Sequence, residues 1–86
     1  MKTLQDYRNE IENIDLNIIE LLAKRFKTVL EIGKYKKDQS LDIIDKDFEN
    51  EKLEKLMVKG QENNLDKNLI KELWNIIFKY AHILEK

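Results

Sequence analysis

Apolar residues recur every three or four positions from Thr3 to Asp38, which is the spacing of one face of an α-helix. Thr3 is a suitable N-cap, and Asp6 three residues later can complete a capping box. No strong helix breaker follows before Asp38, so the pattern predicts one long helix over residues 3–38. At about 100° per residue, an apolar stripe within about 40° of Arg25 contains the following residues: Ile11, Ile14, Ile18, Leu21, Val29, Ile32 and Lys36.

Two shorter helices are expected in the rest of the chain. A short extended connection over residues 41–44 leads to a helix that begins near Asp45 or Asp47. We expect this helix to end at Gly60, because glycine suits a left-handed C-terminal cap. The last helix has Asp66 as its N-cap and runs to the end of the sequence.

The composition supports an all-α fold in a single domain over residues 1–86. Its 86 residues include no proline and two glycines, and good helix formers dominate every segment. The absence of cysteine excludes a disulfide framework and thiolate metal sites, and it fits a reducing compartment. We therefore expect a cytoplasmic location.

Charge and hydropathy narrow the range of partners. The formal net charge is −1 with acids and bases interleaved, so no basic face for nucleic acid is expected. No apolar run approaches the roughly 20 residues of a membrane span, and the N-terminus lacks the apolar core of a signal peptide. Neither nucleic acid nor a membrane is an expected partner.

The apolar stripe of the first helix is too long for the other two helices to cover, which is a problem of coverage. A helix of about 36 residues rises about 54 Å, whereas a compact chain of this size has a radius of gyration of about 12 Å. The two later helices together are about as long as the first and cannot cover all of its apolar stripe. We therefore predict an intertwined homodimer in which the long helices of two chains cover each other.

Charged residues occupy positions where a core is expected. Arg25 lies on the apolar stripe, and arginine is rarely buried unless it is paired. Lys36 returns to within about 20° of the same azimuth, about 16 Å further along the helix. Glu49 and Glu85 lie on the inner faces of the two later helices. This pattern indicates a polar pocket inside a helical bundle, although an internal salt bridge for Arg25 and a solvated helix end for Lys36 are alternatives.

Other polar residues have simpler readings. Asp45 lies one turn before Glu49, and both acids could instead stabilise the N-terminal dipole of their helix. Arg8 lies about 100° from Arg25, so within one chain it cannot easily serve the same pocket. His82 has no neighbour at metal-ligand spacing and is read as a core or surface residue. No metal cluster, phosphate loop or nucleophile–base pair is recognised.

As an ordered set, these residues resemble the all-helical class of chorismate mutase, small intertwined dimers that convert chorismate to prephenate. The resemblance covers essentially the whole chain and rests on these residues: Leu4, Arg8, Ile11, Ile14 and Asp15, the runs 21–25 and 32–36, and Asp45, Glu49 and Glu85. It implies an isomerase without a cofactor, active in phenylalanine and tyrosine biosynthesis. A [3,3] sigmatropic shift needs a positioned substrate and stabilised negative charge, which cations in a dry pocket provide.

The resemblance also implies roles for individual residues. Arg25 and Lys36 would bind the two carboxylates of the substrate, and Lys36 would also reach the ether oxygen. Glu85, in its protonated form, would face the same ether oxygen, so that Lys36, Glu85 and Arg25 are the expected catalytic residues. Arg8 would enter from the partner subunit.

Three further positions complete the expected substrate-binding set. Asp45 and Glu49 would accept from the ring hydroxyl, and Ala81 would stand near a carboxylate. Phe48 departs from the family, in which an arginine is frequent at this position, and Ala81 stands where serine is common. These departures favour a non-catalytic helical dimer as one alternative. Isochorismate-pyruvate lyase, which uses a similar cationic pocket on the same scaffold, is the other.

Overall fold

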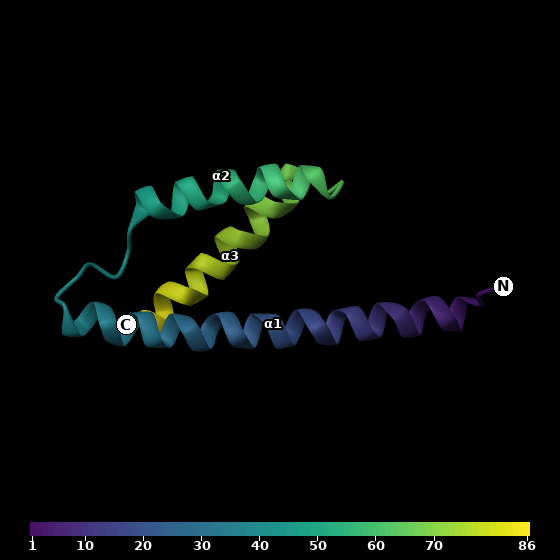
Figure 1. Cartoon of the computed structure of the whole chain (residues 1–86), viewed down its shortest axis with the longest axis horizontal. Coiled ribbons are helices and arrows are strands. Elements are labelled where there is room, and N and C mark those ends of the chain that lie inside the picture. The colour runs from purple at the N-terminus through teal and green to yellow at the C-terminus, as the bar shows by residue number, and fades with distance from the viewer.

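Three α-helices and no strands make up the chain, as the sequence pattern predicts. The computed structural model describes residues 1–86. Helix α1 spans Leu4–Asp38, α2 spans Lys46–Glu62 and α3 spans Lys67–Glu85. A non-helical connection over residues 39–45 joins α1 to α2, and a short turn joins α2 to α3 (Figure 1).

The helix starts are those expected from the sequence. Thr3 and Asp6 form a reciprocal capping box at α1, in which the Thr3 hydroxyl accepts from the Asp6 amide and the Asp6 carboxylate accepts from the Thr3 amide. Asp45 caps α2 by accepting from the Phe48 amide. Asp66 caps α3 by accepting from the Asn68 amide. These short-range bonds satisfy amide groups that a helix leaves unpaired at its first turn.

The expectation that Gly60 forms the C-cap of the second helix is wrong. Helix α2 continues to Glu62, and the left-handed residue is Asn64, with φ of 62°. The Leu65 amide then donates to the Gly60 carbonyl at 2.8 Å, which closes a Schellman-type turn. Asparagine tolerates the left-handed conformation because its short polar side chain can hydrogen-bond locally.

Gly60 instead serves helix packing. It is buried inside α2, where a Cβ atom would lie 2.6 Å from Cγ1 of Ile70 on α3. The missing side chain therefore allows the start of α3 to approach the end of α2. Gly33 on α1 has a similar role, since a Cβ atom there would lie 3.0 Å from the Cα atom of Glu85. The two glycines set the close approaches at both ends of α3.

Helix α3 holds the fold together. It packs against both α1 and α2, whereas the backbones of α1 and α2 do not come close to each other. In Figure 1, α3 crosses obliquely from the end of α2 to the C-terminal part of α1, and the N-terminal part of α1 projects beyond the other helices. The chain is accordingly elongated, with extents of 58 × 24 × 15 Å and a radius of gyration of 16.4 Å.

The predicted problem of coverage is confirmed for the single chain. Buried apolar residues are few and lie where α3 meets the other helices: Val29, Ile70, Ile77, Phe78 and Ala81. Much of the stripe on the first half of α1 is exposed, including Ile11, Ile14, Ile18 and Leu21. None of the three helices combines the length and the hydropathy needed to cross a lipid bilayer.

Replacing Gly60 with alanine is expected to destabilise the fold, although alanine favours helix formation. In an unconstrained helix the change would stabilise by about 1 kcal/mol. Here the new methyl group would overlap buried Ile70, and such overpacking costs about 1–3 kcal/mol. Urea unfolding of Gly60→Ala, Ile70→Ala and the double variant measures the effect.

The double variant is the control for this prediction. Because Ile70→Ala removes the atom that the new methyl group would meet, Gly60→Ala should be neutral or stabilising in that background. Equal destabilisation by Gly60→Ala in both backgrounds would contradict the packing role of Gly60.

Candidate active site

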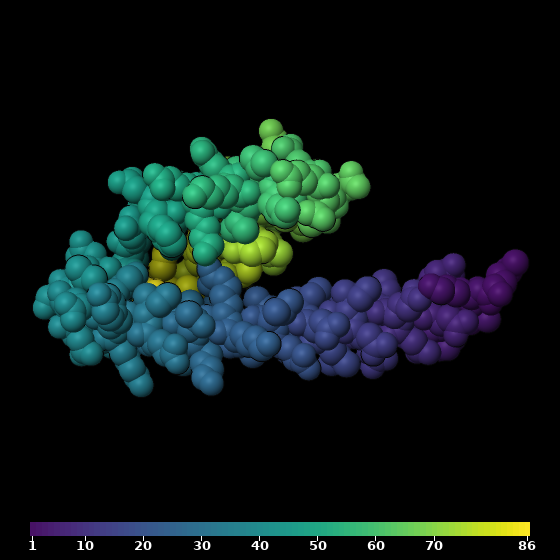
Figure 2. Space-filling model, viewed as in Figure 1, coloured from purple at the N-terminus to yellow at the C-terminus, as the bar shows by residue number.

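A cavity of about 530 Å³ lies between α1 and α2, on the side of α3 that faces both. Its volume is in the range of about 300–1,000 Å³ that is usual for small-molecule sites. Figure 2 shows the hollow between α1 and α2, with α3 behind it. The lining comes from all three helices and the connection: Arg25, Thr28, Val29, Ile32, Lys36, Ile43, Asp45, Phe48, Glu49, Lys52, Phe78, Ala81, His82 and Glu85.

Arg25 lies in this cavity without a hydrogen-bond or ion-pair partner in the protein. Its Nη1 atom is buried and makes no hydrogen bond, and no ion pair of the chain includes Arg25. The guanidinium carbon lies 5.9 Å from the centre of the Phe78 ring, within the range of a cation–π contact. The internal salt bridge considered for Arg25 is therefore not formed.

The electrostatic surroundings of Arg25 are only partly favourable. Removal of the guanidinium from water lowers the pKa of Arg25, and the nearby charges of Glu49 and Glu85 oppose this effect without reversing it. Arginine stays charged at neutral pH in any case. The cavity thus contains a cation whose burial is incompletely compensated, and an anionic ligand would stabilise it.

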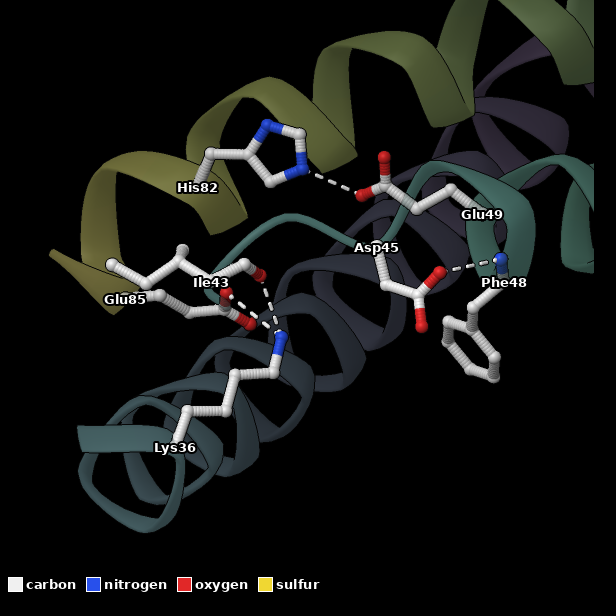
Figure 3. A network of polar contacts seen from close by, with 7 residues as sticks. All are labelled: Lys36, Ile43, Asp45, Phe48, Glu49, His82 and Glu85. Atoms are coloured by element: carbon white, nitrogen blue, oxygen red, sulfur yellow. Dashed lines mark hydrogen bonds and ion pairs between the residues drawn. The ribbon is translucent and has the colours of Figure 1, made fainter. Parts of the chain in front are cut away.

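Lys36 is fixed at the other end of the cavity by two acceptors. Its ammonium donates to the Ile43 carbonyl at 2.6 Å and to Oε2 of Glu85 at 3.3 Å (Figure 3). An ammonium has three N–H donors, so one remains for a ligand. Glu85 is only 7% exposed, although it is the last residue of α3.

Asp45 and Glu49 each have one carboxylate oxygen held by the protein. Oδ1 of Asp45 accepts from the Phe48 amide at 3.1 Å, so Asp45 is both an N-cap and a residue of the cavity. Oε2 of Glu49 lies 2.6 Å from Nε2 of His82, as Figure 3 shows. The second oxygen of each carboxylate has no hydrogen bond to the protein and is available to a ligand hydroxyl.

Six of the seven site residues expected from the sequence line this one cavity: Arg25, Lys36, Asp45, Glu49, Ala81 and Glu85. Arg8 does not. It is exposed on the projecting part of α1, 17 residues before Arg25, which corresponds to about 26 Å along the helix. Within one chain, Arg8 is thus remote from the cavity.

Three polar residues of the cavity were not expected from the sequence: Thr28, Lys52 and His82. The last two can carry a charge. Helical periodicity indicates the positions of His82 and Lys52, because residues three or four apart lie on the same face of a helix. His82 lies four residues after Phe78, and Lys52 lies three residues after Glu49. The Lys52 ammonium lies 5.6 Å from the centre of the Phe48 ring and has no acidic partner in an ion pair. The sequence does not indicate the partner of His82, because this partner, Glu49, lies on another helix.

The arrangement suits recognition of a small anion that also carries a hydroxyl group. Cationic groups from Arg25, Lys36 and Lys52 face the cavity, together with carboxylate oxygens that can accept hydrogen bonds. No group of three potential metal ligands is present. The charged groups that line this partly apolar cavity can position a ligand and stabilise charge on it.

Fold and site together define a three-helix domain with a polar pocket that is lined by both cations and carboxylates. Comparison with known protein families identifies its class. The chain belongs to the chorismate mutase type II family, whose model matches residues 7–86. The family expected from the sequence is confirmed.

Individual relatives agree with this assignment. The chain is 42% identical over 83 residues to a bifunctional chorismate mutase/prephenate dehydratase of Buchnera aphidicola subsp. Schizaphis graminum, covering 96% of this chain and 22% of the relative. It is 30% identical over 73 residues to the T-protein of Haemophilus influenzae, covering 85% of this chain and 19% of that protein. The chain thus spans about a fifth of the length of these relatives.

Replacing Arg25 with methionine is expected to leave the free energy of unfolding within about 1 kcal/mol of the parent value or to raise it. The substitution removes a desolvated cation, and Glu49 and Glu85 keep their partners His82 and Lys36. Urea unfolding is the measurement. A loss above about 3 kcal/mol would show that Arg25 compensates buried acids after all.

Lys36→Met is the matched control, because it removes a cation from the same face of α1. This change leaves buried Glu85 and the Ile43 carbonyl without their donor. We therefore expect it to destabilise the chain by at least about 1.5 kcal/mol.

Proposed function

We propose that this chain rearranges chorismate to prephenate in the cavity between α1, α2 and α3, as a step of phenylalanine and tyrosine biosynthesis. Family membership supports the reaction. The unpaired, partly desolvated guanidinium of Arg25 is the observation that supports the site most directly. A doubly negative substrate would supply the negative charge that Arg25 does not receive from any ion pair within the protein.

Arg25 and Lys36 are the proposed ligands of the two substrate carboxylates. The one uncommitted N–H of Lys36 is proposed to be shared between its substrate carboxylate and the ether oxygen. Glu85, held beside Lys36 at 3.3 Å, is proposed to donate to the same ether oxygen when protonated. Negative charge develops on this oxygen as the bond to the ring breaks, so cations fixed in advance stabilise the transition state more than the ground state.

The free oxygens of Asp45 and Glu49 are the proposed acceptors for the ring hydroxyl. Ala81 lines the cavity and is proposed to stand near a carboxylate of the substrate. The reaction is unimolecular and needs neither a nucleophile nor a cofactor. The protein must hold the flexible side arm of the substrate over the ring, which restricts the reactant to conformations that can react.

The biological unit is proposed to be an intertwined homodimer. The exposed stripe on the first half of α1 needs a cover, and α1 and α3 form an additional groove lined only by apolar residues: Leu22, Phe26, Leu73, Ile76, Ile77, Tyr80, Ile83 and Leu84. In such a dimer the projecting part of α1 carries its Arg8 to the cavity of the other chain. The proposed location is the cytoplasm, since the chain has no cysteine and suits a reducing compartment.

The purified chain, incubated with chorismate, tests the proposed reaction. Loss of chorismate absorbance should be accompanied by formation of prephenate, and Arg25→Ala should lower kcat/KM by at least about a hundredfold. Isochorismate is the second substrate to be tested. Turnover of isochorismate alone would identify a lyase, and no turnover by an intact dimer would identify a non-catalytic helical module.

Mixing two inactive variants tests whether the subunits share their pockets. Random exchange between Arg8→Ala and Arg25→Ala chains should restore about a quarter of the parent activity, because half of the dimers then contain one intact site. Subunit exchange is verified by mass spectrometry of differently tagged chains. Absence of any recovery after verified exchange would contradict a contribution of Arg8 across the interface.

A further inference from the structure

His82 and Glu49 form a contact that the proposed reaction does not use. His82 is the only histidine of the chain and lies on α3, whereas Glu49 lies on α2. Their side chains are 18% and 15% exposed, and the atoms Nε2 and Oε2 are 2.6 Å apart. A contact this short between two largely buried groups fixes the position of the carboxylate (Figure 3).

The position of Glu49 matters because Arg25 is close by. The Glu49 charge acts on the guanidinium strongly enough to oppose the lowering of the Arg25 pKa. Nevertheless, Glu49 and Arg25 form no ion pair, and Nη1 of Arg25 has no hydrogen-bond partner. Both residues line the same cavity, and the bond to His82 holds the Glu49 carboxylate in a position where it makes no ion pair with the guanidinium.

Glu85 is likewise held by a partner other than Arg25. It is the other acid whose charge acts on Arg25, and it pairs with Lys36 instead. Each acid near Arg25 thus has a partner on a different element, and the guanidinium remains uncommitted. Lys36 already has a proposed role with the substrate, so His82 is the one of these two partners whose function in the pocket has not been assigned.

We propose that His82 is a positioning residue that holds Glu49 away from Arg25, so that the guanidinium stays free for a substrate carboxylate. The same bond leaves the second oxygen of Glu49 free to accept from the ring hydroxyl. Without His82, Glu49 turns to Arg25 and neutralises it, and the substrate must displace this internal anion. This inference rests on the proposed chorismate mutase function.

Steady-state kinetics with chorismate test the proposal on the full chain. His82→Leu should raise KM about tenfold, the effect of losing one charge-assisted hydrogen bond, while kcat changes much less. His82→Gln is the conservative control, because its amide can donate to Glu49 from a similar distance. It should bring KM back to within about threefold of the parent value.

A double-variant cycle separates positioning from a general structural role. In a Glu49→Gln background the side chain has no charge with which to neutralise Arg25, so adding His82→Leu should leave KM unchanged. If His82→Leu raises KM equally in both backgrounds, His82 does not act through Glu49. A fall in kcat with unchanged KM would likewise overturn the proposal.

Crystal structures of the parent chain and of His82→Leu provide a readout that does not need turnover. The variant should show an ion pair between Glu49 and Arg25 that the parent lacks. If chorismate is not consumed but the ion pair appears, the proposed reaction fails and the positioning role survives. If chorismate is consumed and Glu49 does not move, only the positioning role fails.

Discussion

An uncommitted guanidinium in a partly apolar cavity is the feature on which the rest of this structure depends. Arg25 lies over the Phe78 ring with a buried Nη1 atom that has no acceptor, and its lowered pKa reflects the loss of water. Two carboxylates are close enough to act on it, but His82 holds one and Lys36 holds the other. The protein thereby keeps a cation available for an anionic ligand.

The packing of the helices forms the cavity in which Arg25 lies. Helix α3 touches both of the others and carries one wall of the cavity, so its two ends must be fixed accurately. Gly60 admits Ile70 at the start of α3, and Gly33 admits the backbone of Glu85 at its end. Close packing at these points places Glu85 within reach of Lys36. A side chain at residue 33 would require the Glu85 backbone to shift.

A small helical domain is sufficient for the proposed reaction because the chemistry demands little of the protein. A unimolecular rearrangement needs a restricted reactant conformation and fixed charges near the ether oxygen. Helices provide rigid supports for such charges, with Arg25 and Lys36 on one face of α1. The projecting half of α1 remains largely uncovered in the single chain, which supports the proposal that a second copy completes both the core and the site.

Periodicity and capping act over a few residues, so the sequence alone predicted the three helices and their N-caps. The resemblance to chorismate mutases supplied the family and the six residues of the cavity. Periodicity also placed Arg25 and Lys36 on one face. The tertiary structure decided what links different helices: the pairing of His82 with Glu49, the Ile43 carbonyl at Lys36 and the packing role of Gly60. These contacts depend on how α3 crosses its neighbours, and the spacing of residues within one helix contains no information on that angle.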